Sequence, residues 1–347
     1  MHPPIVSLVL LKALLFCLLS ASGCATVPYE RYPTIAPYNP PMLHPGEEQF
    51  ERGRPHKVLD TAGWIWGIPS KILLWNLSVD NHRISESTEE TLRTYLRDNG
   101  LDQVKVRLNA YSMADEWARL FRNRSVGAGW RYTLGVLTVA MYTALPGRFF
   151  GGDHYNPYTH TLNIYSDHQS IVIHEGAHAK DFSRRKYRGT YAAIRNIPGV
   201  PLYQEAVATN DALGYLKVRE DVEAQKDGYK ILYPAYSTYI GGAIAQWLPS
   251  PYDYAVAYGV LIRDTWRDAS LRLQWRRTKK AGRNECPPGF SENHRPFPPA
   301  YLKGSRDLLS FCSMVLSVCF RSSLSGSVLP AKSRNGLNAA STSSSAC

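Results

Sequence analysis

The sequence predicts an α+β domain that is mainly helical and carries a small sheet. Helix-start residues and apolar residues at helical spacing recur along the chain, whereas only residues 103–109 and 161–165 alternate apolar and polar side chains as strands do. The chain has 347 residues, of which 44% are hydrophobic, so it is long enough to bury a substantial core. This composition argues against wholesale disorder.

The first 24 residues indicate the signal peptide of a bacterial lipoprotein. Residues 5–20 are apolar apart from Lys12, which suits a signal-peptide core and is short for a membrane span. The run ASGC that ends at Cys24 resembles the lipobox, in which small residues precede a lipidated cysteine. We therefore expect a signal peptide over 1–23, a lipid anchor on Cys24 and a location in the bacterial cell envelope, at the outer membrane or the periplasmic face. The alternative is an ordinary cleaved signal with an incidental cysteine.

Three further segments complete the predicted organisation. Residues 24–60 contain seven prolines and no periodic pattern, which predicts a Pro-rich tether. The folded domain is expected over 61–280, and the serine-rich residues 281–347 are expected to form a disordered tail. Because no cysteine lies between Ala25 and Glu285, a disulfide-stapled domain is excluded.

The charge balance bears on partners rather than on the fold. The formal net charge is +11, and residues 263–283 carry eight Lys or Arg against two Asp. Aromatic residues are sparse in this basic segment, so it is interpreted as a solvated helix face or a contact with anionic lipid. We expect no nucleic-acid partner.

The segments between residue 61 and residue 165 supply the predicted framework. Residues 61–79 include Trp64, Trp66 and Trp75, which favour a core position over a membrane interface. Later segments are predicted as a helix capped by Ser87 with Glu90 and ended by Asn99-Gly100, a half-buried strand over 103–109, a helix over 114–122, a buried helix within the uncharged run 132–147, and a strand over 161–165.

Residues that could bind a metal ion and transfer a proton lie in the segment SDHQSIVIHEGAHAKDF, residues 166–182. The predicted helix begins among Ser166, Asp167 and Ser170 and places His174 and His178 on one face, four residues apart, where both imidazoles can bind one Zn²⁺. A carboxylate beside the metal can take a proton from a metal-bound water, which is what amide hydrolysis requires.

In this helix Glu175 is the residue placed to act as the base, and the small residues Gly176 and Ala177 leave room for neighbouring elements. The alternative interpretation makes His174 and His178 ordinary polar residues of an amphipathic helix.

The run HEGAH resembles the HExxH motif of the zincin metallopeptidases, and the resemblance extends over residues 101–216. It implies a zincin-like α+β fold with a small sheet beside the HExxH helix, and Zn²⁺-dependent hydrolysis of a peptide or protein substrate. In that family an edge strand next to the helix binds the substrate backbone, and we expect the strand near Leu162 to offer this edge. Lys180 departs from the extended motif, which prefers an apolar residue there.

A catalytic zinc normally has three protein ligands, so a third one is sought. A metzincin would have a histidine six residues after His178, where this chain has Arg184, and that subgroup is excluded. The gluzincin subgroup takes a glutamate from a second helix, which makes Glu205, 27 residues after His178 and just beyond Pro201, the expected ligand. An aspartate often follows four residues later to orient a histidine, but Thr209 occupies that place.

Several residues remain open as alternatives. Asp181 and Asp211 are candidates for orienting the histidines, and Asp181 is also the main alternative ligand, ahead of Asp211 and Glu220. The sequence does not choose a group to stabilise the oxyanion among His154, Tyr155, Tyr203 and Tyr239.

The predicted function is hydrolysis of peptide bonds in the bacterial envelope by a zinc-dependent enzyme. One alternative is a non-catalytic lipoprotein that keeps a zincin-like fold as a scaffold, with apolar helices around 231–262 binding a partner or lipid. Another is a membrane-embedded peptidase in which 132–147 and 231–262 enter the bilayer.

Overall fold

The computed structural model describes residues 29–30, 35, 37–150, 152–197 and 200–245. The predictions for the signal peptide 1–23, the lipid anchor on Cys24, the basic segment 263–283 and the tail 281–347 fall outside these residues. So does the second half of the apolar segment 231–262.

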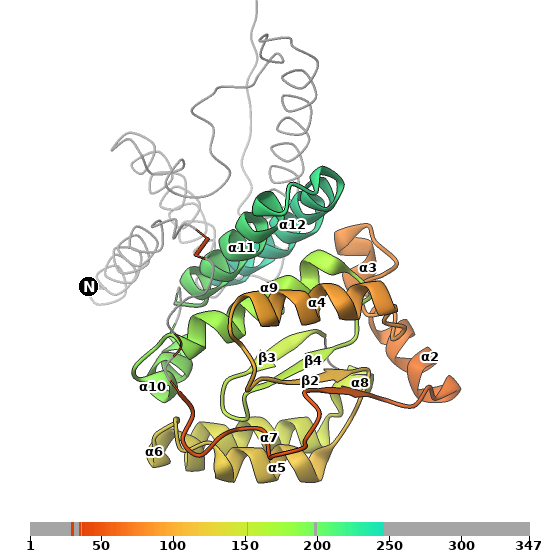
Figure 1. The fold of residues 1–347 in the computed structure, drawn as a ribbon. Coiled ribbons are helices and arrows are strands. Elements are labelled where there is room, and N and C mark those ends of the chain that lie inside the picture. The colour runs from red at the N-terminus through yellow and green to blue at the C-terminus, as the bar shows by residue number, and fades with distance from the viewer. Residues whose placement is uncertain (1–28, 31–34, 36, 151, 198–199, 246–347) are drawn as a thin grey trace, which may run out of the picture.

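A four-stranded mixed sheet lies between layers of helices (Figure 1). The strands are β1 (Phe50–Arg52), β2 (Lys105–Leu108), β3 (His154–Asn156) and β4 (Thr161–Ile164), in the spatial order β1-β2-β4-β3. The first two pairings are parallel, whereas β3 runs antiparallel to β4 with Tyr155 opposite Leu162. Helices with this small sheet confirm the α+β class.

This strand order corrects one expectation. The strand near Leu162 has no free edge, because β2 pairs with one side of it and β3 with the other. Within the described residues the outer strand on this side is β3, and it contacts the helix that carries the HEGAH run.

The helices fall on both faces of the sheet. On the upper face of Figure 1 lie α4 (Glu86–Asp98) and α9 (Gln169–Ser183), with α11 (Val200–Val218) and α12 (Val222–Ala245) packed beyond α9. On the lower face lie α5 (Met113–Arg122), α6 (Ala128–Trp130), the π-helical turn η1 (Arg131–Gly135) and α7 (Val136–Ala144). The remaining helices are α2 (Lys57–Trp66), α3 (Ile68–Leu74), α8 (Gly147–Phe150), α10 (Arg188–Ala193) and the 3₁₀ turn η2 (Ile194–Asn196).

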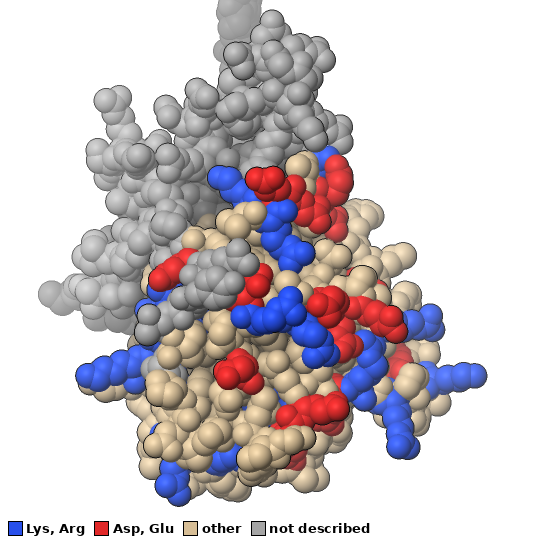
Figure 2. Space-filling model, viewed as in Figure 1, with Lys and Arg blue, Asp and Glu red and all other residues tan. Residues whose placement is uncertain are grey.

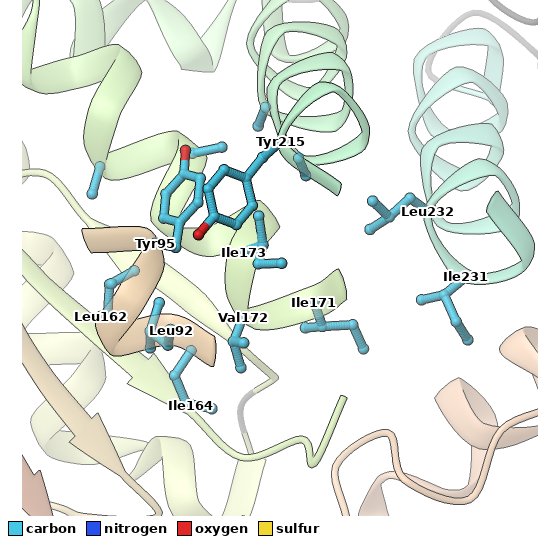
Figure 3. Close-up of a cluster of buried hydrophobic side chains, with 14 of the residues drawn as sticks. Leu92, Tyr95, Leu162, Ile164, Ile171, Val172, Ile173, Tyr215, Ile231 and Leu232 are labelled. Carbon is cyan, nitrogen blue, oxygen red and sulfur yellow. The ribbon is translucent and has the colours of Figure 1, made fainter. Parts of the chain in front are cut away.

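The main hydrophobic core fills the space between the sheet and α9 (Figure 3). Leu162 and Ile164 from β4 meet Leu92 of α4 and Val172 of α9, and all four side chains are fully buried. Burial of each such side chain stabilises the fold by about 1.5–3 kcal/mol. This core fixes α9, and with it the predicted site, against the sheet.

The opposite face of the sheet is polar but also buried, which corrects the expectation of a half-exposed strand over 103–109. Arg107 on β2 is fully covered by α5, where it forms ion pairs with Asp115 and Glu116. Alternating polar residues in β2 therefore mark an internal ion network and not a solvent face.

The Pro-rich segment contributes to the domain from residue 37, so the tether predicted over 24–60 is wrong for its second half. Met42 is fully buried, β1 forms a parallel ladder with β2, and α2 begins at Lys57. Because no proline lies between Pro45 and Pro55, the backbone of β1 has the N–H groups that the ladder needs.

Three local predictions are also corrected. The cap of α4 is Ser85, which accepts a hydrogen bond from the Thr88 N–H, and not Ser87; α9 is capped by His168. The helix within 132–147 is half exposed, with Leu137 and Met141 open to solvent. Trp66 and Trp75 are also exposed instead of packing in the core. Among the described helices, none is both long and apolar enough to cross a bilayer.

Candidate metal centre

The HEGAH run lies in the middle of α9, as predicted. Helical spacing stacks His174 and His178 one turn apart, with ring centroids 4.7 Å from each other. His178 is buried and His174 is slightly more open. The two imidazoles therefore face the same space at one side of the helix.

Gly176 lets α4 approach the same helix closely. A Cβ atom at Gly176 would lie 2.8 Å from the ring of Tyr95 on α4, a distance that real Cβ contacts do not reach. The expectation that this position has to be small is confirmed, and its neighbour is now known. This close contact with Tyr95 packs α4 directly against α9.

Glu205 meets the two histidines from α11. Its Oε2 atom lies 3.1 Å from His174 Nε2 and 3.3 Å from His178 Nε2, and the carboxylate is almost completely buried. Two ligands of a tetrahedral zinc, each about 2.1 Å from the ion, are separated by roughly 3.3 Å. Both distances match this separation, and all three ligand atoms lie within 4.8 Å of one another, so the group could hold a metal ion.

The electrostatics of this cluster follow from burial and close contact. Burial opposes the charged form of His178, but the carboxylate of Glu205 outweighs it and raises the pKa of the imidazole. Burial likewise opposes ionisation of Glu205, yet the histidines and Arg195 hold the pKa of this carboxyl well below its usual range. Glu205 is thus held as an anion between the two imidazoles and Arg195.

Arg195 is a functional candidate that the sequence did not reveal. It lies on η2, and its Nη2 donates a hydrogen bond of 2.5 Å to Oε1 of Glu205, which leaves Oε2 to the histidines. Its side chain is partly exposed at the site. A lone arginine ten residues before Glu205 carries no motif, so only the packing of η2 against α11 identifies it.

Thr209 and Tyr239 also border the cluster. The Oγ1 atom of Thr209 lies 3.5 Å from His174 Nδ1, at the position where gluzincins often have an aspartate. Among the four residues considered for the oxyanion, Tyr239 on α12 is the one beside the cluster, and the charge of Glu205 raises the pKa of its hydroxyl.

Glu175 lies next to these groups but forms no hydrogen bond with them. Its carboxylate is buried and makes no hydrogen bond or ion pair with another described residue. Its charge nevertheless acts on His178, Arg195 and Tyr239, whose pKa values it raises. The carboxylate is therefore close to the candidate metal centre and has no hydrogen-bond partner among the described residues.

The structure does not bring Asp181 or Asp211 to the histidines. Asp181 accepts hydrogen bonds from Arg185 and Tyr191, and Asp211 accepts from Tyr95 and Lys180. Neither residue belongs to the one group of potential metal ligands found among the described residues, and Glu220 does not belong to it either.

The other oxyanion candidates are also engaged away from the cluster. The hydroxyl of Tyr155 bonds His160, His154 contacts Gly152 and Asn163, and Tyr203 lies beside Arg185.

Comparison of the chain with known proteins adds no further identification: no family model, no curated protein and no solved structure matches it.

Proposed function

We propose that this chain is a zinc-dependent peptidase of the gluzincin type. The proposal rests on one observation: two imidazoles four residues apart on α9 converge on a single carboxylate oxygen of Glu205, which comes from a different helix. Two histidines and a glutamate are a common ligand set of catalytic zinc, and they leave a coordination position open. Zinc held there would act as a Lewis acid towards a peptide carbonyl and would lower the pKa of a bound water.

Three residues of the chain would supply proton transfer and stabilisation of the oxyanion. Glu175, which has no competing partner among the described residues, takes the proton of the attacking water and passes it to the leaving amine. Arg195 and Tyr239 are donors at the same place, and they stabilise the negative charge that develops on the carbonyl oxygen. The raised pKa of Tyr239 keeps its hydroxyl protonated, as a donor must be.

The proposed substrate is a peptide or protein segment in extended form. The outer strand β3 offers an unpaired edge within the described residues, and an extended chain can add to such an edge through backbone hydrogen bonds. We place this reaction in the bacterial envelope on the basis of residues 5–24, which indicate a lipidated N-terminus.

Two variants of the full chain test the proposal. Elemental analysis is expected to find about one zinc per chain in the wild type and in Glu175→Gln, and little in Glu205→Ala. Hydrolysis of an unfolded protein such as casein is expected only for the wild type. An exposed acid, Glu220, provides the matched control, since Glu220→Ala removes a carboxylate without touching the cluster.

The outcomes separate an enzyme from a scaffold. Zinc binding with equal activity in the wild type and Glu175→Gln would exclude Glu175 as the base. Absence of zinc from the wild type after refolding with excess zinc would overturn the metal centre and favour a non-catalytic scaffold.

A further inference from the structure

The two helices α2 and α3 turn their small residues towards the body of the domain. A Cβ atom at Gly63 would lie 2.5 Å from the carbonyl oxygen of Arg148, and one at Gly67 would lie 2.6 Å from Cβ of Asp80. The buried positions of this pair are Gly63, Gly67, Lys71 and Leu74, at helical spacing. Only glycine permits such close packing at the first two positions.

Apart from Leu74, most large apolar residues of the same segment point outward, which reverses the usual arrangement of a surface helix. Six of them each expose more than half of their surface: Val58, Ile65, Trp66, Ile72, Trp75 and Leu77, with Trp75 at 77%. We call this surface the α2–α3 face. A group of exposed apolar side chains on one segment is typical of a binding site for a partner or a membrane.

A cavity of about 770 Å³ adjoins the α2–α3 face. Its apolar lining includes Leu59, Phe149 and Phe150, and its charged lining is Glu51, Arg52, Arg54 and Arg148. Arg52 is paired with Glu89 and Arg148 with Asp60, so Arg54 is the guanidinium group of this lining that has no ion-pair partner among the described residues. Trp66 of the face stacks on Phe149 and meets Phe150 edge to face, with 6.5 Å and 5.3 Å between the ring centroids. The face and the cavity therefore form one continuous surface that joins apolar groups to guanidinium groups.

The free charges at the margin of this surface are basic. Arg54 and Lys57 are exposed and have no ion-pair partner within the described residues. Asp60, the acidic residue of α2, is paired with Arg148. Lys and Arg side chains project on the side of the molecule where Figure 1 places α2 (Figure 2). The surface thus combines tryptophan, aliphatic side chains and uncompensated positive charge.

We propose that the α2–α3 face lies on a bilayer that contains anionic phospholipid. Tryptophan is enriched at the membrane interface, where its ring spans the boundary between head groups and acyl chains. Arg54 and Lys57 would contact lipid phosphates, and the cavity beside them accommodates part of one lipid, with its head group at the arginines and its apolar portion on Phe149 and Phe150. The apolar residues 5–20 of the same chain point to the same environment.

A second copy of the chain is a poorer occupant of this surface. In a symmetric dimer the basic margin of one copy would meet the equivalent margin of the other, and like charges would repel. The proposal is independent of the proposed peptidase activity, because no metal ligand belongs to the α2–α3 face.

Tryptophan quenching by brominated lipid tests the proposal on the full chain. The protein is reconstituted in vesicles of phosphatidylethanolamine and phosphatidylglycerol with brominated acyl chains. We expect the quenched fluorescence amplitude to fall in the double variant Trp66→Phe/Trp75→Phe. It should not fall in Trp117→Phe/Trp130→Phe, which removes two tryptophans from α5 and α6, on the lower face of the sheet in Figure 1. Phenylalanine retains the apolar character of these partly exposed sites, so folding is preserved.

The basic margin is tested with the same measurement. Quenching in the wild type should rise with the phosphatidylglycerol fraction, and Arg54→Gln/Lys57→Gln should lose this dependence. The control Arg124→Gln/Lys217→Gln removes two exposed cations elsewhere and should keep it. Equal quenching amplitudes in the two tryptophan variants would overturn the proposal, as would cross-linking of the α2–α3 face to itself in a dimer.

Discussion

Lys180 of α9 donates a partly buried hydrogen bond of 2.5 Å to Asp211 of α11 and so links the helix of the two histidines to the helix of Glu205. Lys180 occupies a position where the zincin pattern prefers an apolar residue, and Asp211 was one of two candidates for orienting a histidine. The structure pairs the two with each other instead. Tyr95 also donates to Asp211, which brings α4 into the same contact.

Removing only one charged partner of the Lys180–Asp211 ion pair should destabilise the protein strongly. Burial lowers the pKa of Lys180 and raises that of Asp211, so each charge depends on the other for its stability in the interior. We expect Lys180→Met to lower the free energy of unfolding by about 3–5 kcal/mol, because it leaves the carboxylate of Asp211 buried without its cation. Urea denaturation in zinc-free buffer measures this change.

The double variant Lys180→Met/Asp211→Asn is the control for the pair. An amide at position 211 still accepts a hydrogen bond from Tyr95, and no charge is left unpaired. The two substitutions should therefore be non-additive by about 1–3 kcal/mol. Strict additivity would show that the ion pair contributes nothing to the link between α9 and α11.

Gly176→Ala should loosen the packing of α4 on the metal-centre helix. The added methyl group meets the ring of Tyr95 at 2.8 Å, so the two helices have to separate, and we expect a loss of about 1–3 kcal/mol in the free energy of unfolding. Gly129→Ala is the matched control, since a Cβ there meets nothing within 4 Å and alanine favours the helix. Thermal unfolding of both variants decides the question; equal stability would mean that α4 adjusts without strain.

The candidate site was largely predictable because its main part is local. His174, Glu175 and His178 share one helix, and helical spacing alone places the imidazoles on one face. Glu205 required the resemblance to gluzincins, and the structure brings it within 3.3 Å of both histidines. Arg195 was not predictable, since its place at the site depends on how η2 packs against α11.

The fold was predictable at the level of class but not of burial. Strand β1 has only three residues, and its partner β2 lies some fifty residues further along the chain. The alternation in β2 predicted an exposed face, but the ion pairs of Arg107 with α5 bury it. The tryptophan-rich sequence around Trp66 and Trp75 is compatible with a buried core or with an exposed interface. The structure shows the exposed arrangement, because glycines and not tryptophans face the body of the domain.

The contribution of Asp80 to the free energy of unfolding falls as the pH rises. It lies between α3 and α4, and burial, reinforced by the charge of Asp153 and opposed by Lys71, raises its pKa to about 7. In the unfolded chain the same carboxyl titrates near pH 4. Between these values the folded state binds a proton that the unfolded state has released, so this contribution is complete below about pH 4 and is lost as the pH passes 7.

Asp80→Asn should remove this dependence. The amide is neutral at every pH, and asparagine tolerates the left-handed backbone at this position, where φ is 45°. We expect the variant to match the wild type at pH 4 and to be more stable by about 2–4 kcal/mol at pH 8. Urea denaturation across this range measures the difference, with Asp102→Asn as an exposed control. A constant difference between variant and wild type from pH 4 to pH 8 would contradict the assignment, because a group that does not titrate between folded and unfolded states cannot change the slope.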